Sequence, residues 1–403
     1  MRIVVFAPDL PYPPNRGGRA DIWRRILAFR QLGHAVMLVN LQETTGAEAP
    51  TQADINFVDS VVARRFSFLM KRGVLIAIRQ LANCWQIPWH AATRVPSAME
   101  LHALSVDLSG FKPDFIWLDG PWFGVVGELF AKRFDVPLLY RSHNIEHRYL
   151  QGQARAAVKL RDRLAWSLVC VGLKRFETKT MQQAIAVFDI SVDDLKYWEG
   201  VGMQHVHWLP PLPELAFKDK PVINPIAGDI VFLGNLGTPN NVRGVEWLVT
   251  EVLPRVLARL PDVRCRIVGS NPTPFVSRLL AGAAGVDLCA NVPDPTPYLF
   301  GARVLVNPVM TGSGVQVKML DMLMTDAPIV TASQGTRGLP HEFWQLFRIA
   351  DDADAFAQAV CEELSASTVN VPARAAAREV FSVAAVGRAL ELATQRQVVD
   401  RHE

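Results

Sequence analysis

Short apolar runs alternate along the whole chain with longer stretches whose apolar residues recur at helical spacing. The runs are rich in Val, Ile and Leu and do not alternate cleanly with polar residues, which is typical of parallel strands covered on both faces. We expect strands at residues 3–7, 34–39, 115–118, 136–140, 230–233, 264–268, 304–306 and 329–331. Helices are expected between them, as at residues 20–32 and 245–260. This order predicts an α/β protein with two doubly wound parallel-sheet domains.

A proline-rich segment interrupts this pattern near the middle of the chain. Residues 207–214 include three prolines in four positions, which excludes a helix or a central strand and predicts an interdomain linker. The pattern of strand, glycine turn and helix then begins again at Asp229. We therefore expect an N-terminal domain at residues 1–205 and a C-terminal domain at 206–385. A C-terminal helix and tail at 386–403 would follow, with packing against the N-terminal domain as one option.

Composition narrows the class of protein. Of the 403 residues, 50% are apolar and 20% are charged, as in an ordinary globular enzyme, and the net charge of +3 argues against a dedicated nucleic-acid binder. The 5 cysteines are dispersed, so we expect neither a disulfide framework nor a zinc site. The first residues lack the apolar region of a signal peptide, and no long apolar run predicts a transmembrane helix. We expect a cytoplasmic protein that starts at Met1.

A first candidate site follows the first predicted strand. The loop ends in Gly17 and Gly18 just before a helix, where backbone amides can approach a phosphate. No G-x-G-x-x-G and no Walker lysine is present, so a dinucleotide site is not expected. A loop that needs glycine only for its turn stays open as the alternative.

A second candidate site follows the strand expected at residues 136–140. There His143, Asn144 and Glu146 come directly after the apolar run, at the strand end where open α/β sheets bind ligands. A structural histidine is the alternative interpretation.

The third and most informative segment spans residues 304–332. A strand leads into the turn Gly312, Ser313 and Gly314, and a short helix is expected from about Val315. Free amides at the start of such a helix can hold a diphosphate. Lys318 and Asp321 lie three residues apart on this helix, and a solvent-facing ion pair between them is the alternative.

At this point the sequence resembles the retaining glycosyltransferases of family 4, which have the GT-B fold of two facing Rossmann-like domains. The matches occur in the family's order over nearly the whole chain. They lie at residues 2–8 with Gly17 and Gly18, 142–146, 232–234 with Asn240 and Asn241, 267–269, 291–294, 312–321 and 336–339.

The resemblance implies a nucleotide diphospho-sugar donor on the C-terminal domain and an acceptor on the N-terminal domain. His143 would lie near the reacting sugar, and we nominate it with Glu146 as catalytic. Asp321 matches the second acid of the family's Glu-x7-Glu motif, which holds the ribose hydroxyls. The donor-binding candidates are Gly17, Gly18, Gly234, Asn235, Arg243, Gly269, Val292, Asp294, Gly312, Ser313, Gly314, Val315, Gln316, Lys318 and Asp321.

Two departures from the family pattern leave other functions open. Ser313 stands where the motif has its first Glu, and Arg243 is the one cation close after the first strand of the C-terminal domain. No Asp-x-Asp stands in a metal-binding context, so we expect transfer without a metal and without a cofactor besides the donor. The alternatives are a catalytically degenerate GT-B protein that binds a sugar or a partner, and a sugar-nucleotide epimerase. A nicotinamide dehydrogenase fits least.

Two segments mix cations with large apolar side chains. They lie at residues 64–72 and 148–175, and in the second the one acid is Asp162. Such patterns suit contact with anionic lipid at the inner face of the cell membrane, or with a lipid diphosphate acceptor. The alternative is a core helix with a solvated basic face. The resemblance suggests a glycan or lipid-linked acceptor in bacterial polysaccharide assembly, and no nucleic-acid partner is expected.

Overall fold

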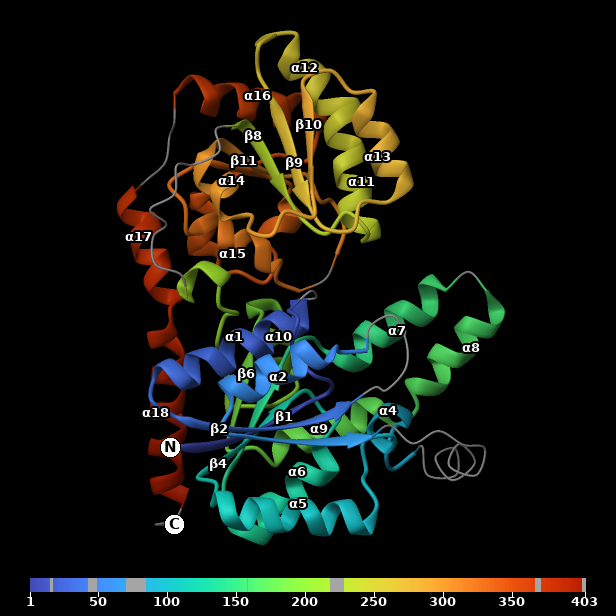
Figure 1. The fold of residues 1–403 in the computed structure, drawn as a ribbon, viewed down its shortest axis with the longest axis vertical. Helices are drawn as coiled ribbons and strands as arrows, with labels where there is room; N and C mark the ends of the chain where they lie inside the picture. Colours follow the sequence, from blue (N-terminus) through green and yellow to red (C-terminus); the bar gives the residue numbers. More distant parts are fainter. Residues whose placement is uncertain are drawn as a thin grey trace. The chain divides into compact units, whose positions relative to one another are not determined.

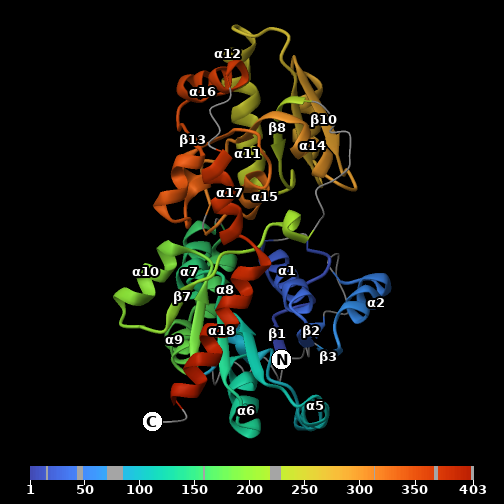
Figure 2. The same ribbon diagram turned by 90° about the vertical axis from the view of Figure 1, so that its left-hand side faces the viewer.

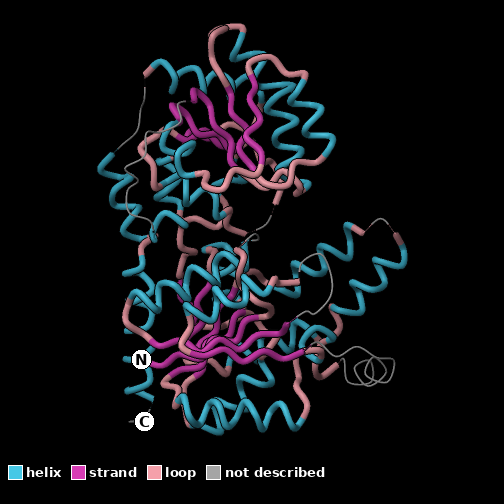
Figure 3. The backbone as a smooth tube through the Cα atoms, in the orientation of Figure 1, coloured by secondary structure: helices cyan, strands magenta, loops and turns pink. Residues whose placement is uncertain are grey.

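The computed structural model describes residues 1–14, 17–42, 49–69, 85–157, 159–217, 228–312, 314–366 and 371–400. They divide into two compact units, each built around its own parallel sheet (Figures 1 and 3). The first unit comprises Met1–Pro211 and Val383–Glu403, and the second comprises Leu212–Ser382. The division therefore falls inside the proline-rich segment, and the end of the chain returns to the first unit.

The first unit contains a sheet of seven parallel strands in the order β3-β2-β1-β4-β5-β6-β7. Its strands are β1 (Arg2–Ala7), β2 (Ala35–Gln42), β3 (Arg64–Leu69), β4 (Phe115–Asp119), β5 (Leu138–Ser142), β6 (Ala186–Asp189) and β7 (Val206–Trp208). Its helices are α1 (Gly17–Gln31), α2 (Gln52–Val61), α4 (Trp89–Ala92), α5 (Ala98–Phe111), α6 (Gly124–Phe134), α7 (Glu146–Ala156), α8 (Leu160–Val169), α9 (Leu173–Gln182), α10 (Val192–Gly200) and α18 (Val383–Asp400).

The second unit contains a sheet of six parallel strands in the order β10-β9-β8-β11-β12-β13. Its strands are β8 (Gly228–Leu233), β9 (Cys265–Gly269), β10 (Val286–Ala290), β11 (Ala302–Asn307), β12 (Ile329–Thr331) and β13 (Arg348–Ile349). Its helices are α11 (Pro239–Trp247), α12 (Leu253–Leu257), α13 (Pro274–Ala281), α14 (Thr296–Gly301), α15 (Val317–Leu323), α16 (Ala353–Ser365) and α17 (Val371–Val380). Short turns of 3-10 helix lie at Glu214–Phe217, Ser333–Thr336 and His341–Leu346, and a π-helical turn lies at Leu248–Val252.

Both sheets are covered on their two faces, as the apolar runs predict. Every residue of β1 after Arg2 is buried, and so is all of β4. Within the first core the Trp117 ring stacks on Phe188 with centroids 5.4 Å apart. Helix starts are set by local caps, and the Ser97 hydroxyl with Glu100 forms a capping box at α5.

The structure adds strands that the sequence pattern did not predict. Strand β3 lies within the 64–72 segment, at an edge of the sheet. Its two arginines contact neighbouring residues of the same unit. Arg65 pairs with Asp59 at 2.5 Å, and Arg64 donates to the Asp107 carbonyl at 3.1 Å. Residues 70–72 lie outside the described residues. His207 and Trp208, expected in the linker, belong to β7, which is an edge strand and so tolerates the prolines that follow.

The strand order places a topological switch point in each sheet. In the first unit β1 is flanked by β2 and β4, and in the second unit β8 is flanked by β9 and β11. The connections leave each of these pairs in opposite directions, which opens a crevice at the carboxyl ends of the strands. Ligand-binding residues are therefore expected after β1 and β4, and after β8 and β11.

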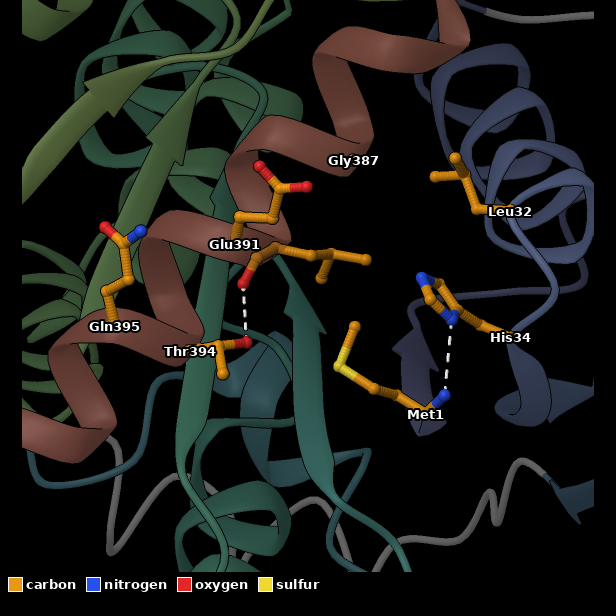
Figure 4. Close-up of a pocket in the computed structure, with 8 residues that line it drawn as sticks. Met1, Leu32, His34, Gly387, Glu391, Thr394 and Gln395 are labelled. Atoms are coloured by element: carbon orange, nitrogen blue, oxygen red, sulfur yellow. Dashed lines mark hydrogen bonds between the residues drawn. The ribbon is translucent and has the colours of Figure 1, made fainter.

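A cavity of about 430 Å³ lies at the opposite, amino edge of the first sheet (Figure 4). Met1 and His34, which precede β1 and β2, line it together with Leu390 and Glu391 of α18. The terminal amine lies 3.2 Å from the His34 ring. In Figure 2 α18 runs along the first unit, and it packs against α1. The cavity is therefore a feature of how α18 is attached, far from the switch point.

Candidate active site

In the first unit a cluster of charged side chains lies at the switch point. Asp119 is the last residue of β4, and Arg141 and His143 lie at the end of β5. Asp21 and Arg25 come from the buried face of α1, one turn apart. Four of these five side chains are almost completely buried, and the His143 side chain is 13% exposed. His143 is thus the member of the cluster that a ligand can reach.

Two arginines neutralise the two carboxylates. Arg141 forms a double hydrogen bond with Asp21, with Nε to Oδ2 at 2.9 Å and Nη2 to Oδ1 at 2.8 Å. Arg25 donates to Asp21 at 2.8 Å and also to Asp119. Burial raises the pKa of Asp21, but Arg141 and Arg25 outweigh it, so that its pKa is held well below the usual range. Arg141 also donates to the Leu209 carbonyl, just before the proline pair.

His143 is held between the two carboxylates. Its Nε2 lies 3.1 Å from Asp119 Oδ1 and its Nδ1 lies 3.3 Å from Asp21 Oδ2. Of these two contacts, the one between Nε2 and Asp119 is a hydrogen bond, whereas Nδ1 has no hydrogen-bond partner among the described residues. The three residues could each offer an atom to a cation within a 4.8 Å cluster. The two arginines already balance the charge of the two carboxylates, so the cluster offers a metal ion no net negative charge.

Glu146 begins α7 in the same region, beside a second buried carboxylate. Glu177 of α9 accepts hydrogen bonds from the backbone of Glu146 at 2.8 Å and His147 at 3.2 Å, and from His147 Nδ1 at 2.6 Å. Glu177 therefore caps α7. Burial, reinforced by the charge of Glu177, raises the pKa of Glu146 to about 8. Glu146 is half-buried, so it can present a proton to a ligand near neutral pH.

Gly17 and Gly18 are the first residues of α1, three positions earlier than the expected helix start at Ala20. A Cβ built on either glycine meets no atom within 4 Å. Packing within the chain therefore does not require glycine at either position. Residues 15 and 16 of the preceding loop lie outside the described residues.

In the second unit, the switch point is surrounded by amide side chains. The Asn235 carbonyl accepts from Asn241 Nδ2 at 2.9 Å, which closes the turn after Gly234. Arg243 donates to Asn240 at 2.6 Å and to Thr311 at 3.2 Å. The first turns of α11 are thereby tied to the loop after β11. Both segments hold or adjoin residues that the sequence nominated for the donor.

Lys318 is the cation at the centre of this group. Its Nζ donates to Asn241 at 3.0 Å and lies 4.6 Å from the centre of the Phe232 ring. Burial of the amine lowers the pKa of Lys318 to about 7. Within the described residues, no carboxylate forms an ion pair with it, so the solvent-facing pair with Asp321 is not present. Asp321 is buried instead and accepts from the Glu214 amide at 2.6 Å.

The glycine turn before α15 is held by a second set of amides. Gln334 donates to the Gly312 carbonyl at 3.2 Å, and Gln316 donates to the Gln334 carbonyl at 3.3 Å. Gly314 has a φ of 67°, which favours glycine. Ser313 lies outside the described residues. The helix begins at Val317, two residues after the expected Val315, and is short, so Gly314, Val315 and Gln316 precede it.

The remaining candidates lie after β9 and β10. Gly269 ends β9, and a Cβ there would lie 2.0 Å from the Gly234 carbonyl oxygen, so no side chain fits. Asp294 accepts from the Thr296 amide at 3.1 Å in the turn that leads into α14. Val292 is half-buried in the same loop. These residues share the carboxyl edge of the sheet with Gly234, but no hydrogen bond joins them to the Lys318 group within the described residues.

The sequence analysis did not nominate several polar residues of these sites. In the first unit they are Asp21, Arg25, Asp119, Arg141 and Glu177, and in the second they are Asn240, Asn241, Asn307 and Gln334. One signal was available: Asp21 and Arg25 are charges on the apolar face of a helix, and Asp119 ends an apolar strand. Buried charges of this kind persist only where partners or ligands match them.

Two Rossmann-like parallel sheets, each with polar groups at its switch point, define the GT-B fold class. Residues 227–366 match the family model of the glycosyl transferases group 1. This match covers most of the second unit, which is therefore similar to the glycosyl transferases group 1.

Other proteins are similar to the chain over nearly its whole length. Over 374 residues, 89% of either chain, the sequence is 24% identical to the "uncharacterized 44.6 kDa protein in cps region" of Klebsiella pneumoniae. Sucrose-phosphate synthase from Thermosynechococcus elongatus shares the fold at a TM-score of 0.64, with 14% identity and 100% of both chains covered. HepE from Anabaena in complex with UDP has a TM-score of 0.62 and 13% identity, over 98% of this chain and 100% of HepE.

Proposed function

We propose that the protein moves a hexosyl group, with retention and without a metal, from a nucleotide diphospho-sugar to a glycan or lipid-linked acceptor in bacterial polysaccharide assembly. The match to the glycosyl transferases group 1 supports glycosyl transfer. The cps-region relative supports a role in polysaccharide assembly, and HepE, a structural neighbour, was solved with UDP. The donor would bind the second unit, and the acceptor would bind the first.

The observation that carries this proposal is the environment of Lys318. An ammonium group is costly to bury without an opposing charge, and this one has only an amide and an aromatic ring as described partners. A diphosphate would supply the missing charge and would favour the protonated amine. Arg243 of α11, held by Asn240 and Thr311, adds a second cation. Together they would stabilise the leaving diphosphate.

On the first unit, the charge cluster would hold His143 in place beside the reacting sugar. His143, fixed by Asp119 and Asp21, would contact the reacting sugar through its exposed edge. Glu146 would donate a hydrogen bond to the acceptor near neutral pH, because burial and Glu177 keep it largely protonated. The leaving phosphate, rather than Glu146, would then take the acceptor proton. No protein nucleophile is required.

The test is release of nucleotide diphosphate from a panel of UDP-, GDP- and dTDP-sugars, measured with the full chain. Lys318→Gln should weaken donor binding by about 10- to 100-fold, the loss of one charge-assisted hydrogen bond to phosphate. His143→Ala should abolish turnover and leave donor binding nearly unchanged. Arg278→Gln, an exposed cation on α13 of the same unit, is the matched control and should change neither.

Two results would contradict the proposal. If Lys318→Gln leaves donor binding unchanged, the diphosphate does not bind at Lys318. Donor binding without turnover, whatever glycan or lipid-linked acceptor is supplied, would favour a degenerate GT-B binding protein.

We also propose that the protein works at the inner face of the cell membrane. The contact we propose is peripheral. Within the described residues, no helix is both long and apolar enough to cross a bilayer.

A further inference from the structure

Helix α8 is unusual among the helices of the first unit because none of its residues is buried. It packs mainly against α7, and the two helices form a hairpin that projects from the body of the unit (Figure 1). A core helix with a solvated basic face, the alternative explanation for this part of the sequence, is therefore excluded for α8. What remains is a helix whose composition must be explained by something outside the unit.

The exposed face of α8 combines leucines with arginines. The side chains of Leu160 and Leu164 are 71% and 63% exposed, and their spacing of four residues places them on the same side of the helix. At about 100° per residue, Arg161 lies on one flank of this pair and Arg163 on the other. Both arginines are exposed. The two leucines thus form an apolar stripe bordered by positive charge.

The opposite face of the helix carries different chemistry. Asp162 and Trp166, one turn apart, are both half-buried and face away from the leucine stripe. Lys159 precedes the helix and Arg155 ends α7, and both are exposed. The cations therefore gather around the stripe, and the single acid of the helix lies away from it.

Helix α5 of the same unit carries exposed apolar side chains without flanking cations. On α5, Met99 and Val106 are 80% and 60% exposed, close to the values for the leucines of α8. Their sequence neighbours are the acids Glu100 and Asp107. Helix α5 therefore offers a comparable apolar exposure with the opposite charge, and it provides an internal control.

We propose that the exposed face of α8, made of Leu160, Leu164, Arg161 and Arg163, docks on the surface of a bilayer that contains anionic lipid. The leucines would enter the boundary between headgroups and acyl chains, and the arginines would contact lipid phosphates while their stems cover apolar surface. This inference rests on the proposed membrane contact and assigns it to one helix. It requires neither the donor nor the acceptor, so it can fail while the transfer reaction stands.

The test is flotation of the purified full chain with vesicles of phosphatidylcholine, with or without phosphatidylglycerol, at low and high salt. We expect binding to the anionic vesicles at low salt and release at high salt. The variant with Arg161→Gln and Arg163→Gln should bind about 20-fold more weakly, from about fivefold for each basic residue. The variant with Leu160→Gln and Leu164→Gln should bind these vesicles at least about tenfold more weakly than the parent protein.

Matched controls separate this surface from general effects. Met99→Gln with Val106→Gln removes two equally exposed apolar side chains from α5 and should leave binding unchanged. Lys132→Gln with Arg133→Gln removes two exposed cations from α6 and should also leave it nearly unchanged. Because α8 has no buried residue, its variants should keep the melting temperature of the parent protein.

Three outcomes would overturn the proposal. The first is no binding of the parent protein to anionic vesicles at low salt. The second is binding that the leucine variant retains in full. The third is a concentration-dependent dimer, seen by light scattering, that the leucine variant abolishes without any vesicle binding by the parent. That last result would assign the stripe to a second copy of the chain.

Discussion

At the scale of single residues, Glu146 illustrates how its surroundings determine the charge of a side chain. Its carboxyl group is half-buried at the start of α7, and its own backbone amide is bonded to Glu177. Burial is the larger cause and the charge of Glu177 the second, and together they raise its pKa to about 8 from a usual 4.5. The folded protein therefore binds a proton here that the unfolded chain releases at much lower pH.

This difference predicts the effect of pH on stability. Between about pH 4.5 and pH 8 the folded state holds one more proton at Glu146 than the unfolded state, so this group lowers stability as pH rises. Glu146→Gln removes the ionisation. We expect the variant to unfold like the parent near pH 5 and to be more stable near pH 8, by about 1 to 3 kcal/mol. Urea unfolding of the variant and the parent at both pH values measures this difference in the free energy of unfolding.

The matched control is Glu199→Gln, which removes an exposed carboxyl group from α10 in the same unit. It should change stability little at either pH. An effect of Glu146→Gln that is the same at pH 5 and pH 8 would show that packing, rather than proton binding, dominates at this position.

His143 shows which part of a site one-dimensional patterns reveal. The sequence predicted a functional histidine because polar residues follow an apolar strand. It did not predict the partners, because Asp21 and Asp119 lie far from His143 along the chain and meet it only through the order of strands. The same holds for Lys318 of α15, whose partner Asn241 comes from α11. The sequence was enough to nominate His143 and Lys318 as site residues. Their electrostatic environment could be described only once the fold was known.

At the scale of elements, the sequence pattern predicted every central strand except β6, and none of the four edge strands. All eight predicted strands are present, and they include β1, β4, β8 and β11, whose residues are buried on both faces. Strand β3 was missed because its side chains alternate and include arginines, as an edge strand with one solvated face allows. The helix expected at residues 245–260 is interrupted by a π-helical turn just before Pro254.

The contact between the ends of β8 and β9 yields a prediction at this scale. A Cβ at Gly269 would lie 2.0 Å from the Gly234 carbonyl oxygen and 2.8 Å from Leu236 Cγ. Gly269→Ala must therefore push apart the two loops that the sequence nominated for the donor. We expect a loss of more than about 2 kcal/mol in the stability of the second unit, and weaker binding of the proposed nucleotide diphospho-sugar donor. Thermal unfolding and calorimetric titration measure the two effects.

Gly282→Ala is the control for this substitution. Gly282 follows α13 in the same unit, and a Cβ there approaches no atom closer than 3.9 Å. Its backbone φ of −93° suits alanine. If the two variants melt at the same temperature and bind the donor with equal affinity, the close approach of the two strand ends does not constrain the site.

At the scale of the whole molecule, the C-terminal segment of the chain is part of the same compact unit as its N-terminal residues. Helix α18 follows the second unit in sequence but is part of the first. It packs against α1, and its buried residues include Val386, Leu390 and Ala393. The sequence left this packing as one option, because an apolar pattern shows that a helix is buried but not against which partner. Folding of the first unit therefore needs residues that lie beyond the whole of the second.

This organisation predicts that a cavity in α18 weakens one unit selectively. Leu390 is 1% exposed, and Leu390→Ala should cost the first unit about 2 to 4 kcal/mol. Hydrogen exchange measured by mass spectrometry should show faster exchange in β1 and β2, while β8 and β9 keep their protection. Leu280→Ala, equally buried in α13, should give the reverse pattern. If Leu390→Ala accelerated exchange equally in both sheets, the two units would unfold as one cooperative body, because local loss of packing would then be transmitted across the unit boundary.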